Sequence, residues 1–99
     1  MKGEGLRRLD REITAEKAAA LGRAGERLEH ALAEAAALAE AARNACDATV
    51  RTAALRDYEV ARGRAQRARA ALLIQREALG LRHHAVVDQQ FPEPPRLPR

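Results

Sequence analysis

The sequence predicts an all-α protein built on an antiparallel helical hairpin. Two stripes of mostly small residues follow helical spacings of three and four, and their registers do not match. The first stripe is Leu21, Ala24, Leu28, Ala31, Ala35, Leu38, Ala42 and Ala45, and the second is Ala54, Tyr58, Ala61, Ala65, Ala68, Leu72, Gln75 and Leu79. Continuing the first stripe would place Thr49, Thr52 and Arg56 on it, so the pattern breaks between Cys46 and Val50. The break predicts two helices with coiled-coil-like packing, joined by a short turn.

The first helix is expected over residues 6–43, after an N-terminal lead of residues 1–5 in which Gly5 is an acceptable N-cap. Gly22 and Gly25 fall inside it, where each costs roughly 1 kcal/mol relative to alanine. They fit either the close approach of a partner helix or tolerated surface positions with a slight bend, and we favour the second interpretation. The apolar face is also broadened by residues that follow the first stripe by one position, namely Gly25, Leu32 and Ala39. This width predicts a third or fourth helix against it.

The second helix is expected over residues 47–79, with Asn44 ending the first helix and Asp47 as the new N-cap. The turn contains neither glycine nor proline, so the alternative is a single rod about 110 Å long at ~1.5 Å per residue. The similar lengths of the two helices and the register break favour the hairpin. Gly80 can take the left-handed conformation that ends a helix, with Leu81 folding back onto it.

Residues 81–99 form a separate C-terminal segment and proline-rich tail. Residues 85–87 can form a short segment that docks on the hairpin, whereas residues 91–99 must be extended because proline fixes the backbone and removes donors. Pro92, Pro95 and Pro98 form two P-x-x-P spacings, and Arg99 follows directly. In the usual SH3-binding pattern one residue separates the last proline from the basic residue, so Arg99 is one place too close. We therefore expect this segment to pack on its own hairpin or on a neighbouring protomer, or else to be free.

The composition argues against a catalytic or ligand-binding core. The apolar content of 46% includes 24 alanines, and at ~25 cal/mol per Å² a methyl group stabilises a core far less than a leucine does. One Phe, one Tyr and no Trp leave little surface for a large pocket. With a single cysteine and no signal-like or membrane-length apolar run, we expect a cytoplasmic protein without a membrane segment or cofactor.

The positive charge is concentrated on the second helix, where residues 51–82 hold eight basic and three acidic residues. Arg62, Arg69 and Arg76 recur every seven residues beside the second stripe. They are candidate phosphate or partner contacts. The plainer interpretation, which we favour, is a solvated flank that pairs across the hairpin with one or more of Glu26, Glu29, Glu34 and Glu40.

Metal binding and nucleophilic catalysis have little support. His83 and His84 are adjacent, so on a helix or strand their side chains diverge and rarely bind one ion together. We expect them to contact a partner or to pack, and His30 to face solvent. Cys46 lies in the predicted turn without a neighbouring histidine, and is interpreted as a small apolar residue.

Two stretches, residues 11–25 (REITAEKAAALGRAG) and residues 75–84 (QREALGLRHH), resemble segments of short uncharacterised proteins of GC-rich bacteria that are grouped as a domain of unknown function. The resemblance covers most of the two helices and implies no activity and no catalytic residue. The chain also matches secreted WXG-type hairpins in size, but it lacks their defining Trp-x-Gly turn.

These observations together predict a non-enzymatic protein that self-associates through the two stripes. The expected assembly is a dimer that forms a four-helix bundle, in which alanines allow close approach and leucines fill the centre. The arginine face, the two adjacent histidines or the C-terminal segment would contact an unidentified protein partner. The alternative is a nucleic-acid-associated helical protein that uses the arginine face.

Overall fold

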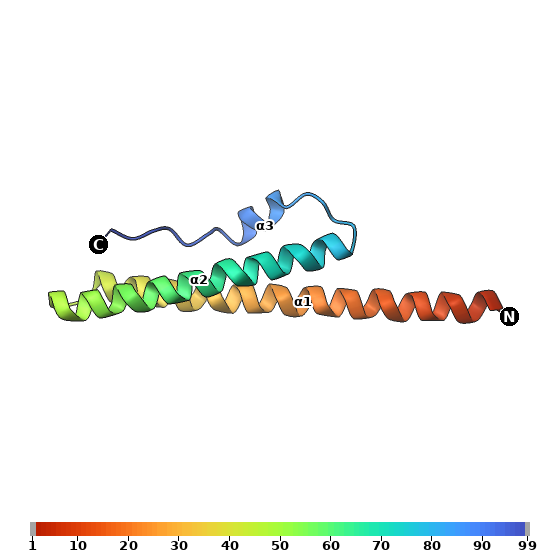
Figure 1. Ribbon diagram of the computed structural model, residues 1–99, viewed down its shortest axis with the longest axis horizontal. Helices are drawn as coiled ribbons and strands as arrows, with labels where there is room; N and C mark the ends of the chain where they lie inside the picture. Colours follow the sequence, from red (N-terminus) through yellow and green to blue (C-terminus); the bar gives the residue numbers. More distant parts are fainter. Residues whose placement is uncertain (1, 99) are drawn as a thin grey trace.

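The hairpin is the main feature of the computed structural model, which describes residues 2–98 (Figure 1). Helix α1, Lys2–Arg43, packs antiparallel against α2, Ala48–Ala78, and the short α3, Ala85–Gln90, follows. The described residues include no strand. The molecule measures 71 × 20 × 15 Å, which excludes a single continuous rod. The predicted all-α hairpin is therefore confirmed.

The turn between the two helices follows the expected capping chemistry. Helix α1 ends at Arg43, and the Asn44 amide still donates to the Glu40 carbonyl at 3.0 Å. Asp47 is extended, and its Oδ1 accepts from the Val50 amide at 2.8 Å. A side-chain acceptor at this position satisfies an amide that the first turn of a helix leaves unpaired. This is why α2 can begin without glycine or proline in the turn.

The start of α1 differs from the prediction. The helix begins at Lys2, so Gly5 is an internal helical residue and not its N-cap. Residues 2–5 therefore belong to the helix instead of forming a lead, and Met1 lies outside the described residues. The strong helix formers that follow extend the helix back through Gly3 and Gly5, because propagation adds a hydrogen bond for each residue fixed.

The two predicted stripes form the contact between α1 and α2. Nine members of the two stripes are buried in the structure, namely Ala24, Leu28, Ala31, Ala35, Ala42, Tyr58, Ala61, Ala65 and Leu72. The remaining members are partly buried, namely Leu21, Leu38, Ala45, Ala54, Ala68, Gln75 and Leu79. Tyr58 and Leu28 are the largest fully buried side chains. The core is as thin as the alanine content predicted, and the stripes are covered within one chain.

The C-terminal segment runs back along the hairpin, antiparallel to α2 (Figure 1). Val87 of α3 is buried with Leu28 and Leu72, and Phe91 packs against the same cluster. Farther along, Leu97 packs against a second cluster that contains Tyr58. We call residues 83–98 the tail. Arg99, predicted as part of it, lies outside the described residues.

The tail explains the unusual width of the apolar face on α1. Leu32 and Ala39 line a shared cavity with Pro92, Pro94 and Pro95 of the tail. The broad face therefore does meet a third element, but that element comes from the same chain and is mostly extended. The width no longer requires a helix from another protomer.

Helix α2 ends as glycine chemistry predicts, with one difference. Gly80 has a φ of +84°, and its amide donates to the Glu77 carbonyl at 2.9 Å. The Leu81 amide donates to the Arg76 carbonyl at 3.0 Å, which completes a Schellman motif. The Leu81 side chain does not fold back, however, and is 42% exposed.

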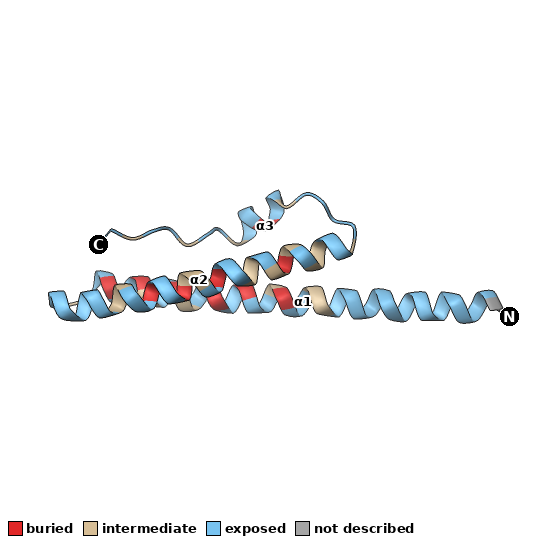
Figure 2. Ribbon diagram, viewed as in Figure 1, coloured by how far each residue is buried: buried red, intermediate tan, exposed pale blue. Residues whose placement is uncertain are grey.

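The first half of α1 packs against no other element among residues 2–98. Residues 3–19 are all exposed, and α2 lies alongside only the later part of α1 (Figure 2). We call residues 3–19 the arm. Leu6, Leu9 and Ile13 on the arm are 63%, 50% and 44% exposed. The apolar stripe of α1 thus continues well beyond the helix that covers it.

Candidate functional site

The predicted arginine stripe holds the tail on the hairpin. Arg69 donates to Asp88 Oδ1 from both Nε, at 3.1 Å, and Nη2, at 2.6 Å. Arg62 donates from Nε to the Pro94 carbonyl at 2.9 Å, and its Nη2 lies 4.0 Å from Glu93 Oε1. Because the tail runs antiparallel to α2, arginines spaced by seven residues meet successive polar groups along it.

The third arginine of the stripe binds the segment that leads into α3. Arg76 donates from Nη2 to the His83 carbonyl at 2.8 Å and from Nε to His84 Nδ1 at 3.2 Å. His84 Nε2 lies 3.2 Å from Glu77 Oε1. Since Nδ1 accepts a hydrogen bond, the ring proton sits on Nε2, which donates to the carboxylate. Both ring nitrogens of His84 are therefore engaged, and His83 contributes its backbone.

Tyr58 fixes the distal half of the tail. Its hydroxyl donates to the Pro95 carbonyl, while its ring lies in the core. Burial raises the pKa of Tyr58 above its ordinary value of 10.0, against the opposing effect of the Arg62 guanidinium. The phenol is therefore protonated at neutral pH, as this donor role requires. Gln66 adds a hydrogen bond of 3.0 Å to Glu93.

These contacts make a peptide-binding groove that is filled by the chain's own C-terminus. Apolar anchors, Val87, Phe91 and Leu97, alternate with the polar groups that the arginines bind. The arrangement holds an extended segment of the same chain through both kinds of contact. In residues 2–98, no group of three His, Cys, Asp or Glu side chains could hold a metal ion.

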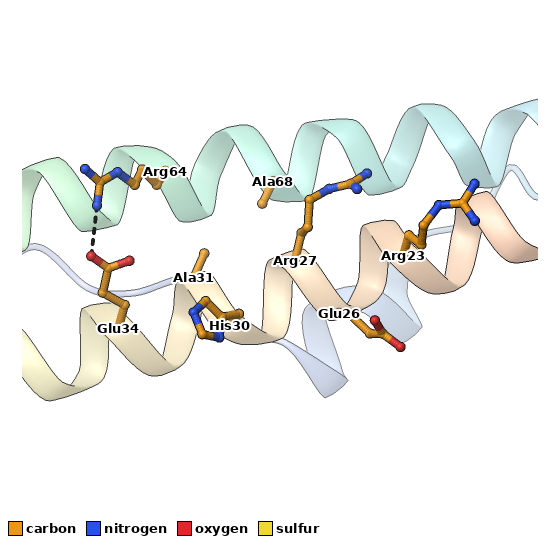
Figure 3. Close-up of a pocket in the computed structure, with 8 residues that line it drawn as sticks. All are labelled: Arg23, Glu26, Arg27, His30, Ala31, Glu34, Arg64 and Ala68. Atoms are coloured by element: carbon orange, nitrogen blue, oxygen red, sulfur yellow. Dashed lines mark hydrogen bonds and ion pairs between the residues drawn. The ribbon is translucent and has the colours of Figure 1, made fainter.

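The opposite groove of the hairpin is open. Its volume is about 580 Å³, and Ala31 and Ala68 lie at its floor between the two helices, while the C-terminal segment passes behind them (Figure 3). The basic and acidic residues that line it are Arg23, Glu26, Arg27, His30, Glu34 and Arg64. Arg64 pairs with Glu34 at 2.8 Å, and His30 is exposed as predicted.

Of the cross-hairpin ion pairs expected for the arginines, the structure forms one. Among the described residues, Arg64 and Glu34 are the pair that joins α2 to α1, whereas Glu40 pairs with Arg43 within α1. The three arginines of the stripe turn to the tail instead. Sequence reasoning grouped the arginines correctly but missed their partners, because nothing local connects Asp88 or Pro94 to residues far back along the chain.

The comparisons with known proteins identify no relative: no family model, no curated protein and no solved structure matches this chain. The function must therefore be argued from the geometry. None of the helices in residues 2–98 combines the length and apolar character needed to span a bilayer.

The predicted self-association stripes require a different interpretation. Every member is buried or partly buried by contacts inside one chain. The stripes therefore hold the hairpin together and are not a free surface. The arm exposes three large apolar side chains, Leu6, Leu9 and Ile13, that lie outside the two stripes.

Proposed function

We propose that this protein is a non-enzymatic interaction protein that acts as a self-associating helical hairpin. The observation that supports this most strongly is the arm. About five turns of helix project from the hairpin without a tertiary contact and expose Leu6, Leu9 and Ile13. The arm is a continuation of α1, which supports its helical conformation, but its three large apolar side chains stay in water and would be stabilised by burial against a partner.

The same face of α1 that packs on α2 continues onto the arm. Ile13 lies eleven residues before Ala24, and eleven residues complete just over three full turns. The apolar face therefore extends past the end of α2, where a second copy can cover it. We propose a dimer joined through the arms rather than through the stripes, so the four-helix bundle expected from the sequence is not our preferred arrangement.

Two further features suit this function. The tail occupies one groove of the hairpin and so leaves a defined set of surfaces, the arm and the open groove, for partners. Cys46 is a lone exposed thiol, which suits the reducing cytoplasm. We therefore propose a cytoplasmic protein.

The solution mass tests self-association directly. Light scattering after size exclusion should give a dimer, with twice the chain mass of 10.8 kDa, at low salt. The dimer mass should also be found at high salt when the protein concentration is high. The mass of a single chain under all of these conditions would contradict the proposal.

We do not propose the nucleic-acid alternative. It rested on Arg62, Arg69 and Arg76, and all three bind the tail. A duplex that bound these guanidinium groups would first have to displace the chain's own C-terminus.

A further inference from the structure

The open groove and the arm carry opposite charges on the same helix. Glu12 and Glu16 lie on the arm, and Arg23 and Arg27 border the open groove. All four side chains are exposed, and none forms an ion pair within 4.0 Å in residues 2–98. Their spacings of four, seven and four residues place them along one flank of α1. The Arg27 side chain points up between the two helices (Figure 3).

Within one chain this pattern is unfavourable. Glu12 and Glu16 are like charges one turn apart, and so are Arg23 and Arg27. Like charges at this spacing destabilise a helix by a few tenths of a kcal/mol. A partner that brought the opposite charge to each pair would turn both repulsions into attractions.

The order of the charges is self-complementary. The point midway between Ala19 and Ala20 lies midway between Glu16 and Arg23, and also midway between Glu12 and Arg27. If a second α1 runs antiparallel across this point, Glu16 of each copy faces Arg23 of the other, and Glu12 faces Arg27. The two alanines at the centre allow the helices to approach closely.

We propose that the open groove binds the arm of a second copy of this chain, so that two hairpins exchange arms about a two-fold axis beside Ala19 and Ala20. This inference rests on the proposed self-association and names its interface. Each arm brings Leu9 level with His30 and Ala31 of the other copy, beside the alanine floor of the groove. One arrangement thus forms the ion pairs and places Leu9 beside the groove, and the interface closes because each copy gives and receives an arm.

Charge reversal tests the interface. The variant E12R/E16R presents four basic residues on this flank, and the variant R23E/R27E presents four acidic ones. Each variant alone should raise the dimer dissociation constant at least tenfold, because the facing charges then repel. An equimolar mixture of the two should form a heterodimer, and the fourfold variant that carries all the reversals should regain the homodimer.

The matched control is R7E/R11E. It makes the same change in net charge as R23E/R27E, with the same spacing of four residues, on another side of α1. It should leave the dissociation constant within about twofold of the wild type. Circular dichroism checks that the helices persist, which we expect because every substituted side chain is exposed.

The outcomes separate this inference from the proposed function. Loss of the dimer in both charge variants, with recovery on mixing, supports the arm exchange. A wild-type dimer whose dissociation constant is unchanged in both variants would overturn the arm exchange and keep self-association. A wild-type protein that stays monomeric would overturn both.

Discussion

The role of each arginine depends on what lies opposite its side chain. Arg69 and Arg67 are two residues apart on α2, yet Arg69 binds Asp88 through two hydrogen bonds while Arg67 is exposed. A guanidinium has a planar set of donors that can hold a carboxylate or several carbonyls, so it suits a site where an extended chain passes. The positive charge on this side of α2 therefore binds the protein's own tail.

Gly22 and Gly25, in the middle of α1, are tolerated positions and do not pack against another part of the chain. A Cβ added at either would meet nothing within 4 Å, so α2 does not approach them closely. We expect Gly22→Ala to raise the free energy of unfolding by about 0.5–1 kcal/mol, because alanine loses less backbone entropy in a helix. Chemical denaturation followed by circular dichroism measures this change.

Gly80→Ala serves as the opposite control for that substitution. Gly80 has a positive φ, which side chains with a Cβ adopt at a cost of about 1 kcal/mol. This variant should be less stable than the wild type. Equal stabilities for the two glycine variants would contradict our explanation.

Tyr58 should make the stability of the tail depend on alkaline pH. Its pKa is raised above 10.0 by burial, so the folded state favours the protonated phenol more than the unfolded state does. The stabilisation is fully present below pH 10 and is lost as the pH rises through the raised value. Because Tyr58 is the only tyrosine, its phenolate absorbance reports the titration directly.

We therefore expect the Tyr58 titration midpoint to lie above 10.0 in the folded protein and to return to about 10 in denaturant. Tyr58→Phe should lose roughly 1 kcal/mol at neutral pH, the usual worth of one hydrogen bond, and should lack the tyrosine-dependent part of the alkaline loss. A midpoint that is the same in the folded and denatured protein would argue against burial as the cause.

At the scale of elements, the tail replaces a third helix. It follows the groove between α1 and α2 and contributes Val87 to one core cluster and Leu97 to the partly buried shell of the other. A hairpin whose stripes are mostly alanine buries little apolar area, so this extra coverage adds larger side chains where the two helices leave a gap. The tail is part of the fold rather than an appendage.

The arginine contacts of the tail can be tested by a matched pair of substitutions. Arg69→Ala removes both hydrogen bonds to Asp88, whereas Arg67→Ala removes an exposed arginine two residues away. We expect Arg69→Ala to speed amide hydrogen exchange in α3 several-fold and Arg67→Ala to leave it unchanged. Asp88→Asn should resemble Arg69→Ala, and the double variant should add little to either.

At the scale of the whole molecule, the structure is a thin hairpin that extends into a longer single helix. Its longest dimension of 71 Å is several times its other two, and the core occupies only the part where α1, α2 and the tail overlap (Figure 2). The overlap region therefore holds the fold together, and the arm contributes no contact to it among the described residues.

Buried charge in the overlap region should unfold the whole hairpin. Leu28 and Leu72 belong to one cluster and are 1% and 5% exposed. We expect Leu28→Asp combined with Leu72→Asp to abolish the cooperative thermal transition and most helical circular dichroism, because charges cannot be buried there unpaired. Ile74→Asp, on an exposed face of α2, is the control and should keep both signals. An unchanged melting temperature in the Leu28 and Leu72 variant would refute this account of the core.

The sequence by itself determined the helices, their caps and the residues that face each other. The break in register separated the two helices, and Asp47 and Gly80 marked the beginning and the end of the second one. The stripes predicted which residues of the two helices pack together. These features are local, because spacing and capping act over one or two turns. The start at Lys2 differed because neighbouring residues extended the helix.

Only the tertiary structure decided what covers each face. It showed that the stripes are satisfied within one chain, that Arg62, Arg69 and Arg76 hold the tail, and that the arm has no partner there. A helical pattern shows that a face must be buried or that a charge is exposed, but not which distant segment lies against it. That choice depends on where the chain turns after Gly80 and how far α2 reaches along α1, and these are properties of the folded molecule.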